Sequence, residues 1–77
     1  MGIYTVETDY VYAPQDSLEE ATKSYDQNLA RLVAGDHLVS YVRLEHKYYN
    51  SDNEHKIKVL RCSRGLADTI NAKRGII

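Results

Sequence analysis

A chain of 77 residues has room for one hydrophobic core, so residues 1–77 are expected to form a single domain. Ten Lys and Arg residues against 11 Asp and Glu residues give a formal net charge of −1, which excludes a protein that holds nucleic acid by bulk positive charge. The single cysteine, Cys62, excludes an internal disulfide. Short apolar runs and an N-terminus without signal-peptide features predict a cytoplasmic protein that does not associate with membranes.

The first element in chain order is a strand, which we predict over residues 3–12. Side chains alternate between two faces along this segment, and β-branched and aromatic residues are frequent. Pro14 is expected to end the strand, because proline has no N–H to donate to a neighbouring strand.

A helix is predicted over residues 17–34. Asp16 and Ser17 are alternative N-caps, and each is followed three residues later by a glutamate, so both registers give a capping box. Gly35 then supplies the left-handed residue that ends many helices. Apolar residues recur at helical spacing on one face of this segment: Leu18, Ala21, Tyr25, Leu29, Leu32 and Val33.

Two further strands, over residues 37–49 and 54–63, are predicted to form an antiparallel hairpin closed by the turn-forming segment 50–53. Pairing Tyr49 with Glu54 sets the predicted register. In that register one face of the hairpin is mainly apolar and packs on the helix. The other face is mainly charged, with Glu45 opposite Lys58.

A short C-terminal helix over residues 66–74 completes the predicted fold, which belongs to the α+β class. We expect a two-layer β-α-β-β sandwich, with helix 17–34 packed on a three-stranded, mostly antiparallel sheet. Two strand orders are compatible with the sequence. The favoured order, 2-3-1, places the first strand beside the third, and the alternative, 1-2-3, places it parallel to the second. Ile76 and Ile77 pack either in the core or on another chain.

The sequence shows no pattern typical of catalysis, metal binding or cofactor binding. His37, His46 and His55 lack zinc-ligand spacing, and no histidine is placed to activate Cys62. The four glycines form no phosphate-binding loop. We therefore expect a protein that is not an enzyme, with no catalytic residue, no metal and no cofactor.

The charged face of the hairpin is the candidate binding site. The chain has seven Tyr but no Phe or Trp, and tyrosine suits surfaces that are half exposed because its ring is apolar and its hydroxyl is polar. The predicted partner-binding residues combine tyrosines with basic side chains: Tyr41, Arg43, Lys47, Tyr49, Lys56 and Lys58.

This composition indicates a surface that binds another protein, since tyrosine and arginine anchors are typical of protein interfaces. The expected function is a non-enzymatic protein–protein interaction module. Small accessory proteins of phages and mobile elements act in this way when they inhibit or modulate a host or defence protein by occluding a site. A homodimer, formed through a sheet edge or through exposed tyrosines, is also expected. The alternative is a small nucleic-acid-binding protein that uses the Tyr, Lys and Arg face of hairpin 37–63.

Overall fold

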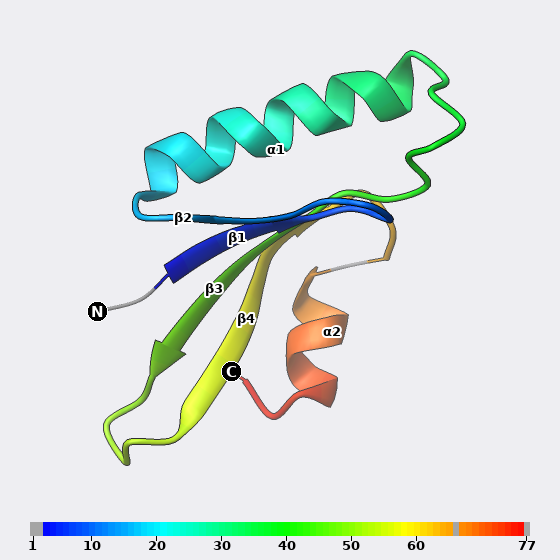
Figure 1. The fold of residues 1–77 in the computed structure, drawn as a ribbon. Coiled ribbons are helices and arrows are strands. Elements are labelled where there is room, and N and C mark those ends of the chain that lie inside the picture. Colours follow the sequence, from blue (N-terminus) through cyan, green and yellow to red (C-terminus); the bar gives the residue numbers. More distant parts are fainter. Residues whose placement is uncertain (1–2, 66, 77) are drawn as a thin grey trace.

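The computed structural model describes residues 3–65 and 67–76 and shows an α+β fold with two helices and a four-stranded antiparallel sheet. The helices are α1 (Leu18–Val33) and α2 (Ala67–Lys73), and the strands run in the order β2-β1-β3-β4 (Figure 1). The strand bounds are β1 Ile3–Glu7, β2 Tyr12–Gln15, β3 Arg43–Tyr49 and β4 His55–Cys62. α1 packs on β1, β2 and β3, whereas α2 packs on β4.

The segment predicted as one strand, residues 3–12, turns back on itself, so the prediction of three strands is wrong. The amide of Thr8 donates to the carbonyl of Val11 at 2.8 Å, and its hydroxyl accepts from the amides of Tyr10 and Val11. β2 then pairs with β1, with Pro14 opposite Thr5. Proline is tolerated here because β2 is an edge strand, where the missing N–H faces away from the sheet.

The favoured strand order is also wrong, because β1 pairs with β3 and not with β4. The alternative order has the correct neighbours but the wrong direction, since β1 and β3 are antiparallel. The additional strand explains the direction. β2 reverses the chain before α1, so α1 leads back to the end of the sheet from which β3 runs opposite to β1 (Figure 1).

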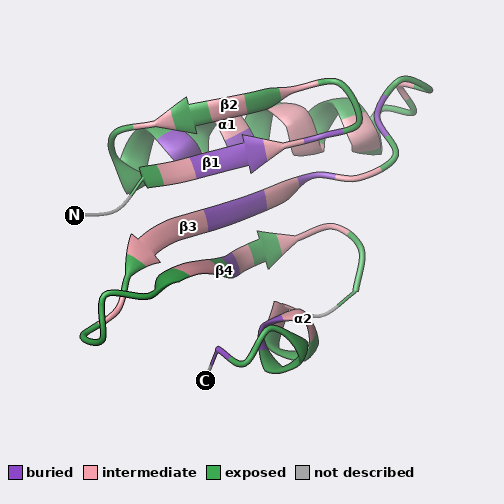
Figure 2. Ribbon diagram, turned by 60° about the horizontal axis from the view of Figure 1, so that its bottom comes forward, coloured by how far each residue is buried: buried purple, intermediate pink, exposed green. Residues whose placement is uncertain are grey.

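The core lies between α1 and the sheet, and Figure 2 shows buried segments along β1 and β3. The predicted helix 17–34 is confirmed to within one residue at each end. The hydroxyl of Ser17 accepts from the amide of Glu20 at 3.2 Å, and Gly35 follows the helix with φ of 86°. The buried core cluster draws on α1, the sheet and the loop before β3: Val6, Ala21, Tyr25, Val39, Val42 and Leu44.

The β3–β4 hairpin differs by one residue from the predicted register. Tyr49 pairs with His55 instead of Glu54. The amide of Asn50 donates to the carbonyl of Glu54 at 3.0 Å, so the loop has three residues, and Asn53 has φ of 60°. A three-residue loop with a left-handed residue is a common hairpin connection. A shift of one residue moves the β4 side chains of residues 55–59 to the opposite face from the predicted one.

A bulge in the same hairpin shifts the register again. Glu45 pairs with Val59 but Leu44 pairs with Arg61, so Leu60 lies between these pairs and packs against the core. Val59 lies on the face of the sheet away from α1 and is only 1% exposed. The second face is therefore partly buried, in contrast to the open face of a two-layer sandwich.

α2 covers the outer edge of β4 (Figure 2). The side-chain amide of Asn71 accepts from the Val59 amide at 2.8 Å and donates to the Val59 carbonyl at 2.9 Å, as a neighbouring strand would. Arg74 donates to the carbonyl of Ile57 at 3.1 Å and to the carboxylate of Glu45 at 2.8 Å. The predicted pair of Glu45 with Lys58 is therefore wrong, because the register places these residues on opposite faces.

The C-terminal helix is shorter than the predicted range 66–74. Leu66 and Ile77 lie outside the described residues. Ile76 is 9% exposed, and its amide donates to the carbonyl of Asn71 at 2.8 Å. Of the two interpretations for the C-terminus, the structure thus favours packing within the chain for Ile76.

Candidate functional site

The structure keeps four of the six predicted site residues together and separates the other two. Four residues share the face of the sheet away from α1, because they follow the alternation that places Glu45 there: Tyr41, Arg43, Lys47 and Tyr49. The two β4 lysines are on the α1 side, where they pair with Tyr48 and His46: Lys56 and Lys58. Both still reach the surface, because α1 packs on the other three strands. The predicted grouping of all six is wrong.

Strand pairing aligns the side chains away from α1 in transverse rows. From one end of the sheet to the other, the rows contain Tyr12, Glu7, Arg43 and Cys62; then Pro14, Thr5, Glu45 and Val59; then Ile3, Lys47 and Ile57; and finally Tyr49 and His55. Arg74, the residue after α2, reaches the second row through its hydrogen bond to Glu45. We use the name tyrosine face for the aromatic, basic and large apolar side chains of this surface that are at least partly exposed: Ile3, Tyr12, Tyr41, Arg43, Lys47, Tyr49 and His55.

The middle of the tyrosine face is held by a contact between Lys47 and Tyr12. The Nζ atom of Lys47, in the third row, lies 4.4 Å from the centroid of the Tyr12 ring, in the first row. The lysine side chain therefore extends across the second row, in which Thr5 is 1% exposed. A cation–π contact of this kind contributes about 0.5–1 kcal/mol at an exposed site. Lys47 is thus positioned over the sheet and is not a free solvent-facing side chain.

One end of the tyrosine face exposes large apolar side chains. Tyr49 is 64% exposed and Ile3 is 50% exposed. The Tyr49 and His55 rings lie 5.3 Å apart, and a shallow cavity of about 200 Å³ lies among Ile3, Lys47, Tyr48, Tyr49 and His55. Exposed apolar groups beside a cation and a hollow are typical of contact surfaces.

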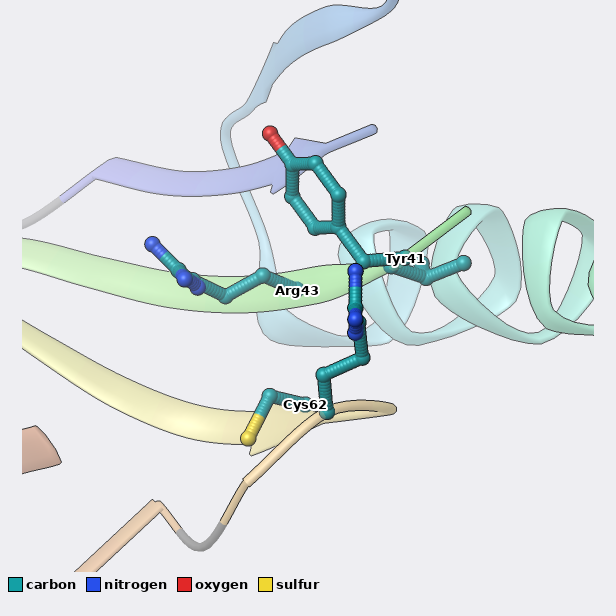
Figure 3. Close-up of a pocket in the computed structure, with 5 residues that line it drawn as sticks. Tyr41, Arg43 and Cys62 are labelled. Carbon is teal, nitrogen blue, oxygen red and sulfur yellow. The ribbon is translucent and has the colours of Figure 1, made fainter. Parts of the chain in front are cut away.

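The other end of the tyrosine face is polar. The Tyr41 hydroxyl donates to Glu7 Oε2 at 2.9 Å and lies 3.3 Å from the carbonyl oxygen of Thr8. Burial of the ring, and then the neighbouring Glu7 carboxylate, raise the pKa of Tyr41. A cavity of about 160 Å³ opens beside this pair, lined by Tyr41, Val42, Arg43, Cys62 and Arg64 (Figure 3).

A second aromatic cluster lies on the α1 side of the sheet. The His46 ring stacks on Tyr4, with centroids 4.5 Å apart, and on Tyr48, with centroids 5.0 Å apart. Burial lowers the pKa of His46, and the positive charge of Lys58 lowers it further. Sequence reasoning missed this cluster because it depends on the pairing of β1 with β3. The available signal was the alternation of side chains, which places His46 and Tyr48 on the same face of one strand and Tyr4 on one face of another.

Basic and acidic residues are distributed unequally along the fold. Eight of the ten Lys and Arg residues lie in residues 43–74, which form β3, β4 and α2 and their connections. Seven of the 11 Asp and Glu residues lie in residues 1–36. Residues 43–74 therefore carry a net positive charge although the chain as a whole is nearly neutral. Three of these basic residues, Lys56, Lys58 and Arg61, lie on the α1 side of the sheet and not on the tyrosine face.

The described part of the chain comprises residues 3–65 and 67–76. In these residues no three His, Cys, Asp or Glu side chains are grouped so that they could hold a metal ion. The Cys62 thiol is engaged locally, donating to the carbonyl of Gly65 at 3.2 Å. Neither of the helices in the described part of the chain is long and apolar enough to cross a membrane.

The chain was also compared with known proteins. No family model matches it, and no curated protein or solved structure matches it either. The candidate site therefore rests on the geometry and chemistry of the tyrosine face.

Proposed function

We propose that the chain is a non-enzymatic protein-binding module and that the tyrosine face is its contact surface. The observation that carries the proposal is the exposure of large side chains on a single face: Tyr12 is 52%, Tyr49 64% and Ile3 50% exposed. Lys47 lies opposite Ile3, and Arg43 lies in the same row as Tyr12. Protein interfaces are enriched in tyrosine and arginine, and a few such anchors supply most of the binding energy.

The free energy and the surface area available on the tyrosine face are adequate for specific binding. Burying the exposed part of Tyr49 would remove on the order of 100 Å² from water, which is worth about 2–3 kcal/mol. A standard interface buries about 800 Å² on each partner, roughly 15% of the 5286 Å² surface of this chain. The residues of the face are mostly on paired strands supported by α1 and α2, so little conformational entropy is lost when they bind.

Occlusion is the mode of action that we propose for this module. A small rigid face that covers a site on a host or defence protein inhibits or modulates it without chemistry of its own, as in an accessory protein of a phage or mobile element. A second copy of the chain is another candidate partner. Pairing through sheet edges is disfavoured for such a dimer, because α2 covers β4 and Pro14 lies in β2. The tyrosine face is the better candidate for a homodimer contact.

A second candidate function is binding of single-stranded nucleic acid on the α1 side of the sheet. The stacked rings of Tyr4, His46 and Tyr48 lie beside Lys56 and Lys58, and rings flanked by lysines can stack bases and neutralise phosphates. These rings already cover one another, which leaves fewer ring faces for bases. We therefore propose protein binding as the main function and nucleic-acid binding as the second candidate.

Affinity capture from the native host tests the proposal. Tyr49→Ala should lose the captured partner while the melting temperature stays close to that of the wild type, because the side chain is 64% exposed. Tyr10→Ala is the matched control, since Tyr10 is 77% exposed but lies in the β1–β2 turn. Equal capture by both variants would contradict the proposal. A salt-sensitive gel shift that Lys58→Glu removes would support the second candidate instead.

A further inference from the structure

We propose that the cavity at the polar end of the tyrosine face is a carboxylate-binding pocket. The inference deepens the proposed function and rests on it for the source of the ligand, which is an acidic side chain or a free C-terminus of the partner protein. The pocket itself is argued from the Arg43 and Arg64 side chains and from the space between them.

The cavity is built where two segments distant in sequence lie side by side. Arg43 begins β3 and pairs directly with Cys62 at the end of β4, and Arg64 follows two residues later. Both arginines line a volume of about 160 Å³, and Figure 3 shows Tyr41, Arg43 and Cys62 around it. A water molecule occupies about 30 Å³ in the liquid, so the space accommodates a carboxylate group together with some water.

Arg43 has hydrogen-bonding capacity that the described part of the chain does not use. Its Nε atom is buried and has no hydrogen-bond partner among residues 3–65 and 67–76. The Glu7 Oε2 atom lies 3.9 Å from Arg43 Nη1, which is too far for a hydrogen bond. Glu7 instead accepts the hydroxyl proton of Tyr41 at 2.9 Å. A buried donor without an acceptor is unfavourable, so a movement of the Arg43 side chain that brings its guanidinium to a ligand oxygen in the cavity is favoured.

The charges around the cavity favour an anion, and the shape of a guanidinium favours a planar one. Arg43 and Arg64 carry two positive charges, and Glu7 at the margin carries one negative charge, so the pocket has a net attraction for an anion. A carboxylate fits the fork of a guanidinium with two parallel hydrogen bonds. The Tyr41 ring forms a less polar wall suited to the methylene groups of an acidic side chain.

Titration with small carboxylates followed by NMR tests the pocket without the partner. The side-chain Nε–H signal of Arg43 is recorded while acetate is added, with acetamide as the neutral control and with constant ionic strength. We expect a saturable shift with a millimolar Kd for acetate and none for acetamide. Arg64→Gln should weaken acetate binding up to about fivefold, the effect of removing one partly exposed charge. Arg61→Gln, which removes a β4 charge outside the cavity lining, should leave the Kd unchanged.

Two comparisons decide the outcome. N-acetylglutamate α-amide and N-acetylalanine carry a side-chain and a terminal carboxylate, respectively, and tighter binding of either one supports the pocket and identifies the source. The absence of a saturable shift with all carboxylates would overturn the inference. Tighter binding of inorganic phosphate than of acetate would also overturn it. These titrations are independent of partner capture with Tyr49→Ala, so failure of the pocket and failure of the proposed function are distinguishable.

Discussion

Removing the side-chain amide of Asn71 should destabilise the fold strongly, because that amide is the link between α2 and the edge of β4. Asn71 is 6% exposed and bonds both the amide and the carbonyl of Val59, at 2.8 and 2.9 Å. Asn71→Ala leaves a buried donor and a buried acceptor unsatisfied, at about 1–3 kcal/mol for each. With partial access of water to the vacated space, we expect a loss of about 2–4 kcal/mol. A 77-residue domain has roughly 4–11 kcal/mol of stability in total.

Urea denaturation followed by far-UV circular dichroism measures this loss. The matched control is Asn28→Ala in α1, whose side-chain amide donates only to the Ser24 carbonyl one turn earlier, at 2.8 Å. This control should lose no more than about 0.5 kcal/mol. Hydrogen exchange at the Val59 amide should accelerate in Asn71→Ala, since its acceptor is removed. Equal, small losses of unfolding free energy in the two variants, with the Val59 amide still protected from hydrogen exchange, would refute the role of Asn71 at the edge of β4.

Three further predictions concern charged and titratable groups. Arg74→Met should cost about 2 kcal/mol in urea denaturation, because the Glu45 carboxylate, 6% exposed, loses its cation; Lys73→Met on the same helix should cost less than about 0.5 kcal/mol. His46 has a folded-state pKa below its unfolded value, so the unfolded state binds more protons and stability should fall as pH falls below about 6.5. The urea concentration at the midpoint of unfolding should therefore be lower at about pH 5.5 than at about pH 7.5 in the wild type, and this difference should be smaller in His46→Phe. Equal differences in the two proteins would contradict the buried environment of His46. Tyr41 has a raised pKa, so its contribution to stability is present below about pH 10 and is lost at higher pH, and Tyr41→Phe should show a shallower alkaline decline.

Helix α1 was predictable because its signals are local. The Ser17 cap and the left-handed Gly35 mark its ends, and both act within a few residues along the chain. Apolar spacing also identified Ala21 and Tyr25 as buried. Leu18 and Val33 share that spacing but lie at the two ends of the helix and are 46% and 81% exposed.

The β1–β2 hairpin was not predictable from alternation. The pattern of alternating side chains continues through the turn, which contains no glycine or Asn-Gly pair. Thr8 replaces these signals with its hydroxyl, which accepts from two following amides. Pro14 was interpreted as the end of a strand, whereas it lies within an edge strand.

Three of the four predicted site residues that stay together lie on β3, and they followed from the sequence for a geometric reason. Residues of one strand that are two apart share a face in any register, so Arg43, Lys47 and Tyr49 stay together. The faces of Lys56 and Lys58 depend on the loop, and the left-handed conformation of Asn53 changed the pairing by one residue. A single-residue difference in a loop was therefore enough to divide the predicted site.

The most direct test of the account is site-specific photo-crosslinking in the native host. Benzoylphenylalanine is placed at position 49 or position 12 on the tyrosine face, and at position 58 on the opposite face as the comparison. We expect positions 49 and 12 to cross-link to the same protein and position 58 not to cross-link to it. Cross-links to a protein from position 58 alone would contradict the assignment of the tyrosine face as the contact surface.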